Sequence, residues 1–173
     1  MSRALLFDTC VVQHYLHPKV LDRWPHLAER IARAVRDAGG FHISEVIAFE
    51  IRRGLAVLAR KGQGRKKAAR AELLLRKAYT HPLNAMSWHR AIDIYADGQE
   101  HRPVVNLSDG DLLITATAVA SSRILLTMDR RLHEALCALG ASRAHRADGP
   151  ELSSMQPRAD CRARQRGRGA RGS

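Results

Sequence analysis

The sequence predicts an α/β fold: a central, mainly parallel sheet of about four or five short strands with helices on both faces. Short apolar runs alternate with longer stretches of helical periodicity as far as about residue 145. Strands that are apolar along their whole length are typical of a parallel sheet buried on both faces, and the alternation predicts strand–helix–strand crossovers. Apolar residues make up 45% and aromatic residues only 5%, so we expect a core built mostly from Leu, Ile, Val and Ala.

In the first half of the chain, proline, glycine and serine mark the boundaries between elements. Pro25 divides the first long helical stretch because proline lacks an amide hydrogen, and Gly39-Gly40 ends it. Ser44 is a suitable N-cap for the next helix, which reaches Lys61 before Gly62-Gln-Gly64 breaks the chain. The predicted elements are a strand over 4–7, a helix over 11–16, helical sequence over 19–38, a strand over 41–43, a helix after Ser44 and a helix over 65–80.

In the second half, Ser108 is the clearest boundary, since it can cap a helix that runs through Ala120. No internal repeat is visible. The other elements are a strand over 83–86, a helix over 88–98, a loop over 101–107, a strand over 123–127, a helix over 130–139 and a marginal strand over 142–145. The length suits one folded domain over 1–148, followed by an Arg/Gly-rich tail over 149–173 that we expect to be disordered.

Positive charge is concentrated in two places on a chain whose net charge is +12. Residues 52–77 hold ten basic side chains and one acid, and residues 156–173 hold six arginines and one acid. This pattern indicates a polyanionic partner such as nucleic acid, although a solvated helix face and an idle tail are the plain alternatives.

The three cysteines, Cys10, Cys137 and Cys161, fit neither a disulfide framework nor a zinc finger. No apolar run approaches the about 18 residues that a membrane span needs, and the start of the chain lacks a signal-peptide cleavage pattern. We therefore expect a cytoplasmic protein that does not use a membrane.

Three aspartates are predicted to follow strand ends or to begin helices: Asp8, Asp111 and Asp129. In open α/β sheets, ligand sites lie at the carboxyl ends of the strands. Aspartate is also a favoured helix cap, so each position taken alone has an ordinary structural explanation.

Glu50 is harder to explain structurally. At about 100° per residue it falls near the middle of an arc that includes Val46, Ile47, Ile51 and Val57. A carboxylate among apolar side chains is unfavourable unless it is paired or binds a metal. The alternatives are an ion pair with Arg53 or an edge position that reaches water.

Clustered carboxylates without histidine or cysteine ligands suit a hard cation, Mg²⁺ or Mn²⁺. No HExxH, Walker loop, GxGxxG or GxSxG occurs in the sequence. Acidic residues at strand ends on a basic protein therefore indicate a nuclease, in which divalent ions activate water for attack on a phosphodiester. Asp109 is an extra acid, which we interpret first as favourable charge at a helix start and second as a supplementary ligand.

Four segments carry a more specific signal. They are Leu5-Leu-Phe-Asp8-Thr9, Ser44-Glu-Val-Ile-Ala-Phe-Glu50-Ile-Arg-Arg-Gly54, Asp111-Leu-Leu-Ile-Thr-Ala-Thr-Ala118 and Leu125-Leu-Thr127-Met-Asp129. In order and spacing they resemble the PIN-domain ribonucleases, and within them the VapC-like toxins of bacterial toxin–antitoxin modules. The resemblance implies a single PIN-like domain, Mg²⁺- or Mn²⁺-dependent cleavage of RNA, a cognate antitoxin as inhibitor and a homodimer.

The resemblance also implies roles for individual residues. Asp8 and Asp111 match the firmest metal ligands, Glu50 completes the catalytic cluster, and Asp129 matches its most variable position. Thr127 matches a hydroxyl near the fourth acid, and we assign it, with Arg52 and Arg53, to substrate binding. Cys10 stands where the family often has Asn or Ser, which is expected to alter a hydrogen bond beside the site.

Two other functions remain open. A phosphatase of the haloacid-dehalogenase type also begins with Asp at a strand end, but it needs a second Asp two residues later, where this chain has Cys10. A non-catalytic PIN-like module that binds RNA or a partner would have no need of Glu50. Substitution Glu50→Gln separates the nuclease from the non-catalytic module, since a nuclease would lose cleavage and keep RNA binding.

Overall fold

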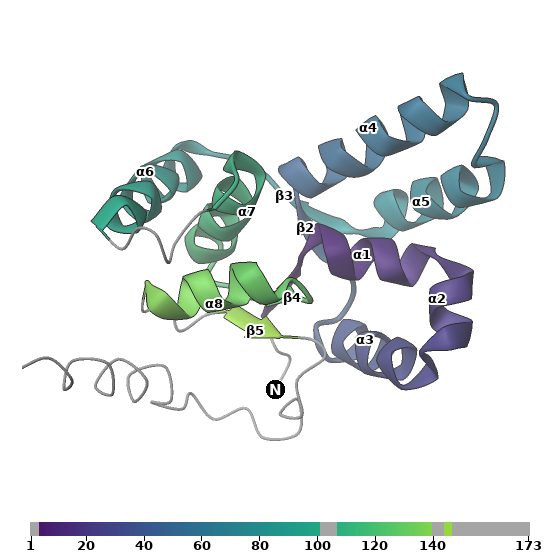
Figure 1. Ribbon diagram of the computed structural model, residues 1–173, viewed down its shortest axis with the longest axis horizontal. Helices are drawn as coiled ribbons and strands as arrows, with labels where there is room; N and C mark the ends of the chain where they lie inside the picture. Colours follow the sequence, from purple (N-terminus) through teal and green to yellow (C-terminus); the bar gives the residue numbers. More distant parts are fainter. Residues whose placement is uncertain (1–3, 101–106, 140–143, 147–173) are drawn as a thin grey trace, which may run out of the picture.

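The computed structural model describes residues 4–100, 107–139 and 144–146, which form an α/β fold in which every strand pair is parallel (Figure 1). This confirms the predicted fold class. The predicted tail over 149–173 lies outside the described residues. The strands are β1 (Leu5–Phe7), β2 (His42–Ser44), β3 (Tyr79–His81), β4 (Ile124–Thr127) and β5 (Ala144–Arg146). The helices are α1 (Thr9–Leu16), α2 (Pro18–Arg23), α3 (Pro25–Asp37), α4 (Glu45–Arg60), α5 (Arg65–Lys77), α6 (Ala85–Glu100), α7 (Asp109–Ala120) and α8 (Arg130–Ala138).

The hydrogen-bonded strands of the described residues form two groups instead of the single sheet that we expected. One group has the order β1-β4-β5 and the other pairs β2 with β3. β1 also lies against β2, but no backbone ladder joins them. Strands of three residues form only a few ladder bonds along an edge, so a small displacement is enough to separate neighbours.

The third strand was predicted at the wrong place. β3 occupies Tyr79–His81, which we assigned to the end of a helix, and it pairs with β2 through His42 opposite Tyr79. The two rings stack with centroids 4.6 Å apart. The predicted strand over 83–86 is instead the start of α6, where the Asn84 side chain accepts a hydrogen bond from the Ser87 amide at 3.0 Å. Tertiary pairing and a side-chain cap therefore override the apolar run.

Helix starts agree better with the sequence. Ser44 caps α4 by accepting from the Ile47 amide at 3.2 Å, and Ser108 caps α7 by accepting from the Asp111 amide at 3.2 Å. Pro25 begins α3 after a break from α2, as predicted. These caps place the first turns of α4 and α7 close to the ends of the strands.

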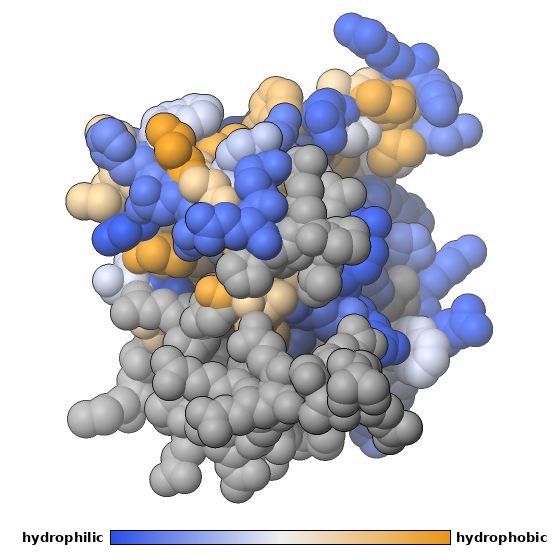
Figure 2. All heavy atoms as spheres, turned by 60° about the vertical axis from the view of Figure 1, so that its left-hand side comes forward, coloured by the Kyte–Doolittle hydropathy of each residue, from blue (hydrophilic) through white to orange (hydrophobic). Residues whose placement is uncertain are grey.

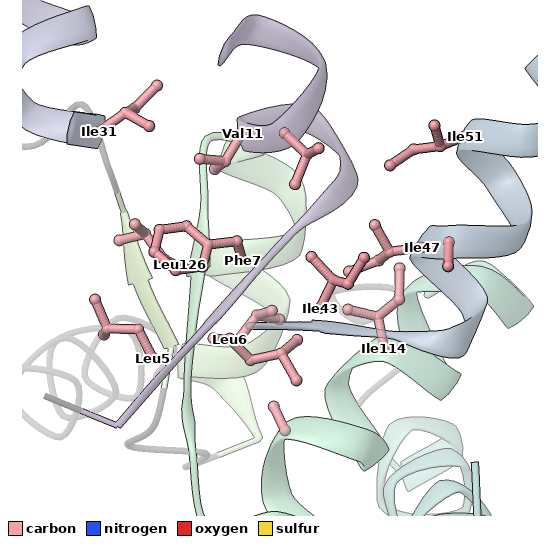
Figure 3. Close-up of a cluster of buried hydrophobic side chains, with 14 of the residues drawn as sticks. Leu5, Leu6, Phe7, Val11, Ile31, Ile43, Ile47, Ile51, Ile114 and Leu126 are labelled. Atoms are coloured by element: carbon pink, nitrogen blue, oxygen red, sulfur yellow. The ribbon is translucent and has the colours of Figure 1, made fainter. Parts of the chain in front are cut away.

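The core lies where the strands meet α1, α4 and α7 (Figure 3). Leu6 and Phe7 of β1 and Leu126 of β4 are each 0% exposed. Ile47 of α4 and Ile114 of α7 pack into the same cluster. Burial on both faces explains why the strand sequences show no alternation of polar and apolar residues.

Two helix pairs project from this centre in different directions. α4 and α5 run side by side away from the strands, while α6 packs along α7 on another side (Figure 1). Figure 2 turns the α6 side toward the viewer and shows apolar residues scattered among hydrophilic ones. No helix of the described residues is long and apolar enough to cross a membrane.

Candidate active site

The site is built at the carboxyl ends of β1 and β4, which are parallel neighbours. Asp8 directly follows β1, and Asp129 follows β4 by two residues. The amide of Asp8 donates to the carbonyl of Leu126 at 3.0 Å, which extends the pairing of the two strands. Both aspartates therefore lie at one edge of the β1-β4-β5 group, as expected from the crossover topology.

Asp8 is the most constrained of the acidic residues. The residue is only 4% exposed. Its carboxylate accepts three hydrogen bonds. The Thr9 amide donates to Oδ1 at 2.6 Å, while the Thr127 hydroxyl at 2.6 Å and the Cys10 thiol at 3.0 Å both donate to Oδ2. Burial raises the pKa of Asp8, the three donors lower it in part, and the charge of Asp111 raises it further. A buried carboxylate beside a second acid favours a cation in its neighbourhood.

Thr9 connects Asp8 to Glu50. Its hydroxyl donates to Glu50 Oε2 at 2.6 Å, so a single residue holds one carboxylate through its amide and another through its side chain. The connection joins α1 to α4 across 41 positions of sequence. It fixes the orientation of Glu50 toward the site.

Glu50 lies at the edge of the buried face of α4, not at its centre. The buried residues of the helix are Ile47, Ala48 and Ile51, whereas Val57, which we placed in the same apolar arc, is 49% exposed. The edge position that we kept as an alternative is therefore the observed one. Glu50 reaches Thr9, and the Arg53 guanidinium lies over the Phe49 ring, 5.7 Å from its centroid.

Gly110 leaves space for the carboxylate of Glu50. A Cβ atom placed on Gly110 would lie 3.0 Å from Glu50 Oε1, which is closer than ordinary side-chain contacts. Gly110 is in the first turn of α7, directly before Asp111. The absence of a side chain at this position lets the Glu50 carboxylate approach the turn that carries Asp111.

Asp111 and Ser108 are joined by two hydrogen bonds. The Ser108 hydroxyl donates to Asp111 Oδ2 at 2.7 Å and accepts from the Asp111 amide. Asp111 thereby completes a reciprocal cap at the start of α7. Its negative charge raises the pKa of Asp8. The structure thus places Asp8, Glu50 and Asp111 around the junction of α1, α4 and α7.

Asp129 is the N-cap of α8. Its Oδ1 accepts from the amides of Arg131 at 2.8 Å and Leu132 at 3.2 Å. Its own amide donates to the Thr127 hydroxyl at 2.9 Å, and that hydroxyl in turn donates to Asp8. The capping interpretation of Asp129 is therefore correct, and a role in metal binding stays a prediction.

Thr127 lies between two of the acids. The residue is 0% exposed, and its hydroxyl donates to Asp8 and accepts from the Asp129 amide, which suits it to positioning the acids; a contact with substrate stays a prediction. Arg52 and Arg53, the other two residues assigned to substrate binding, are exposed on α4. They remain available to a substrate.

Cys10 joins Asp8 to the segment that follows β4. Its thiol donates to Asp8 Oδ2, and its sulfur accepts from the Met128 amide at 3.2 Å. Burial, followed by the charge of Asp8, raises the pKa of Cys10 to about 12. The side chain therefore stays a neutral thiol at physiological pH, so it can donate the hydrogen bond to Asp8.

The donor set fits a hard divalent cation, since it consists of carboxylate oxygens with hydroxyl and amide support. Within the part of the chain that the structure describes, however, no three acidic, histidine or cysteine side chains lie close enough together to form a ready-made metal site. The closer convergence that we expected of the four acids is not observed. Each of the four acids instead accepts hydrogen bonds from neighbouring donors.

Sequence reasoning missed two contributors to this arrangement. In the sequence, Thr9 is only one member of a matching segment, and Gly110 has no role assigned to it. Thr9 follows Asp8 and Gly110 precedes Asp111 in the sequence. This adjacency is the only sign in the sequence that either residue belongs to the site. Their importance depends on the approach of α1, α4 and α7, which no local pattern reveals.

Comparisons with known proteins concern the family and the fold. A family model of the PIN domain matches residues 5–135. No curated protein matches the chain. Among solved structures, the chain is similar to one in the crystal structure of VapBC2 from Rickettsia felis bound to a DNA fragment from their promoter. The TM-score is 0.56 at 12% identity, with 82% of this chain and 97% of that chain covered, so this likeness concerns the fold.

Proposed function

Because the chain belongs to the PIN-domain family, we propose that it is a metal-dependent endoribonuclease and the toxin component of a toxin–antitoxin module. The observation that carries the proposal is the buried Asp8, held by three donors beside Thr9-bound Glu50 and the charge of Asp111. Such a site at the carboxyl end of parallel strands, on a chain of net charge +12, suits a phosphodiester substrate.

Asp8 and Asp111 would hold the principal cation, Mg²⁺ or Mn²⁺, with Glu50 and Asp129 as further ligands or water-orienting groups. A divalent ion bound there would supply an activated water and neutralise charge on the phosphate. The protein's own contribution is positioning. Thr127 and Cys10 fix one oxygen of Asp8, and Thr9 fixes both the other oxygen and Glu50.

The substrate would reach the site along basic surface. Arg52 and Arg53 are exposed on α4, close in sequence to Glu50, and α5 adds further basic residues. Arginine and lysine contacts to phosphates give affinity without much sequence choice. RNA is therefore the proposed substrate, and a cognate antitoxin and a second copy of the chain are the proposed protein partners.

The test is cleavage of end-labelled RNA by purified full-length protein with Mg²⁺ or Mn²⁺. We expect fragments that disappear with EDTA and with Asp8→Asn. Asp109→Asn is the matched control, because Asp109 is an exposed acid in the same helical turn as Asp111. It should cleave like the wild type.

Cleavage that survives Asp8→Asn would show that a contaminating nuclease is responsible. RNA binding without cleavage, in protein that mass spectrometry shows to be free of a bound antitoxin, would favour the non-catalytic module. Glu50→Gln then adds a second check. It should abolish cleavage and leave binding intact if the acids are catalytic.

A further inference from the structure

An aromatic ring stands exposed on α4 directly beside the site. Phe49 is 61% exposed and precedes Glu50. An isolated apolar residue on a surface is ordinary and needs no explanation. Here, however, the Arg53 guanidinium lies over the ring, 5.7 Å from its centroid, which is a cation–π contact on the solvent side of the helix.

The helix places these two residues next to Glu50. At about 100° per residue, Arg53 falls between Phe49 and Glu50 around the helix axis, and residues three or four apart have Cβ atoms about 5–6 Å from each other. Phe49, Arg53 and Glu50 therefore share one side of α4, with Arg53 between the other two. A ligand at Glu50 that extends over Arg53 would reach the Phe49 ring.

The charge around the ring is positive. Arg52, Arg53 and Arg60 are exposed on α4. The acids of the helix are engaged elsewhere: Glu45 accepts from the Leu83 amide at 2.9 Å, and Glu50 accepts from Thr9. An aromatic ring among arginines, next to carboxylates suited to a cation, complements a base attached to a phosphate.

We propose that Phe49 and Arg53 form a subsite for the nucleotide adjacent to the cleaved bond. The base stacks on the Phe49 ring, and Arg53 moves from the ring to bind the phosphate. This inference rests on the proposed function for the nature of its ligand. It adds that the substrate must be single-stranded at this nucleotide, because a paired base cannot leave its stack to reach the ring.

The experiment measures binding of a fluorescent single-stranded RNA by anisotropy, in the full chain carrying Asp8→Asn so that the RNA stays intact. Phe49→Ala should raise Kd about fivefold or more, the range that stacking of one base gives. Phe49→Tyr keeps the ring and should restore binding, whereas Phe49→Leu keeps only apolar bulk and should not. Trp88→Ala removes an aromatic residue that is 51% exposed on α6 and should have no effect.

A second ligand tests the base itself. An oligonucleotide of the same length made of abasic nucleotides keeps the phosphates, so it should bind equally to Phe49→Ala and to the protein with Phe49 intact. The inference is overturned if Phe49→Ala binds ordinary RNA unchanged, or if Phe49→Leu binds as well as Phe49→Tyr. The latter result would indicate that apolar bulk at this position is enough for RNA binding, without stacking of a base on a ring.

The two proposals fail in different ways. Wild-type protein that cleaves RNA, with no effect of Phe49→Ala on binding, overturns the subsite alone. Wild-type protein that binds RNA without cleaving it overturns the nuclease, while a Phe49 effect on binding still supports the subsite.

Discussion

At the scale of single residues, Asp8 shows how a functional site opposes stability. The carboxylate is buried, and the three hydrogen bonds that it accepts offset only part of its desolvation, since burial is the largest influence on its pKa and raises it. Functional sites often keep such unfavourable groups because the rest of the fold stabilises them.

The first prediction concerns the stability of Asp8→Asn. Because the pKa of Asp8 is raised above its ordinary 3.8, the folded protein keeps this proton to a higher pH than the unfolded chain does. The ionised group thus lowers the free energy of unfolding as pH rises through that interval. Asp8→Asn should melt at a higher temperature than the wild type at neutral pH, and the difference should shrink below about pH 4.

Thermal melts followed by circular dichroism, with and without Mg²⁺, test this prediction. Mg²⁺ should raise the Tm of the wild type and leave that of Asp8→Asn unchanged, because a ligand stabilises only the state that binds it. A lower Tm for Asp8→Asn at neutral pH would contradict the account.

The second prediction concerns Thr9, which holds Asp8 and Glu50 together. Thr9→Val keeps the shape and the amide but loses the hydroxyl that donates to Glu50. Outer hydrogen bonds to metal ligands typically contribute about 10- to 100-fold, so cleavage should fall by that factor. Thr9→Ser should retain most activity. Equal rates for Thr9→Val and the wild type would remove Thr9 from the positioning machinery.

At the scale of elements, α4 carries both the site and a glycine that weakens the helix. Gly54 lies in the interior of α4 with nothing near its missing side chain, whereas Gly64 follows the helix with φ at 81°. A Cβ on Gly64 would also approach Leu58 Cδ1 to 3.0 Å. The two glycines should therefore respond in opposite ways to the same substitution.

The third prediction follows directly. Gly54→Ala should raise the free energy of unfolding by about 0.5–1 kcal/mol, because alanine loses less conformational entropy in a helix. Gly64→Ala should lower it by about 1 kcal/mol or more, because the left-handed backbone conformation strains any side chain. Urea titrations of both variants measure these changes in the free energy of unfolding. Changes of the same sign in the two variants would contradict the prediction.

At the scale of the whole molecule, the basic residues and the acids of the candidate site lie on different parts of the fold. Basic residues gather on α4 and α5, which project from the centre of the fold (Figure 1), whereas Asp8, Glu50 and Asp111 lie around the junction of α1, α4 and α7. In the proposed nuclease, this arrangement would place phosphate-binding residues apart from the carboxylates that hold the cation. It also makes binding dependent on the ionic strength of the solution.

The fourth prediction is a steep salt dependence of RNA binding. If about five phosphates contact basic residues, log Kd should change with log salt with a slope of about 3.5, a loss of about 100-fold between 50 and 200 mM salt. Removing Arg60 and Lys61 together should reduce that slope by about 1.4 if both contact phosphates. An anisotropy titration at several salt concentrations measures both slopes, and a flat response would exclude this surface as the RNA contact.

Local sequence patterns were enough to predict the α/β class, the helix caps at Ser44 and Ser108, and the acidic positions at strand ends. These features follow from local rules, since apolar runs, capping serines and strand-terminal aspartates act within a few residues of themselves. The sequence also located most element boundaries, because proline and glycine restrict the backbone wherever they occur.

The remaining features depend on contacts between segments that are far apart in the sequence. The position of β3 depends on pairing with β2, the edge position of Glu50 depends on which face of α4 is covered, and the burial of Thr127 depends on β4 lying beside β1. The roles of Thr9 and Gly110 depend on contacts between helices far apart in sequence. Such contacts are made by packing, and packing is a property of the whole core that no short segment encodes.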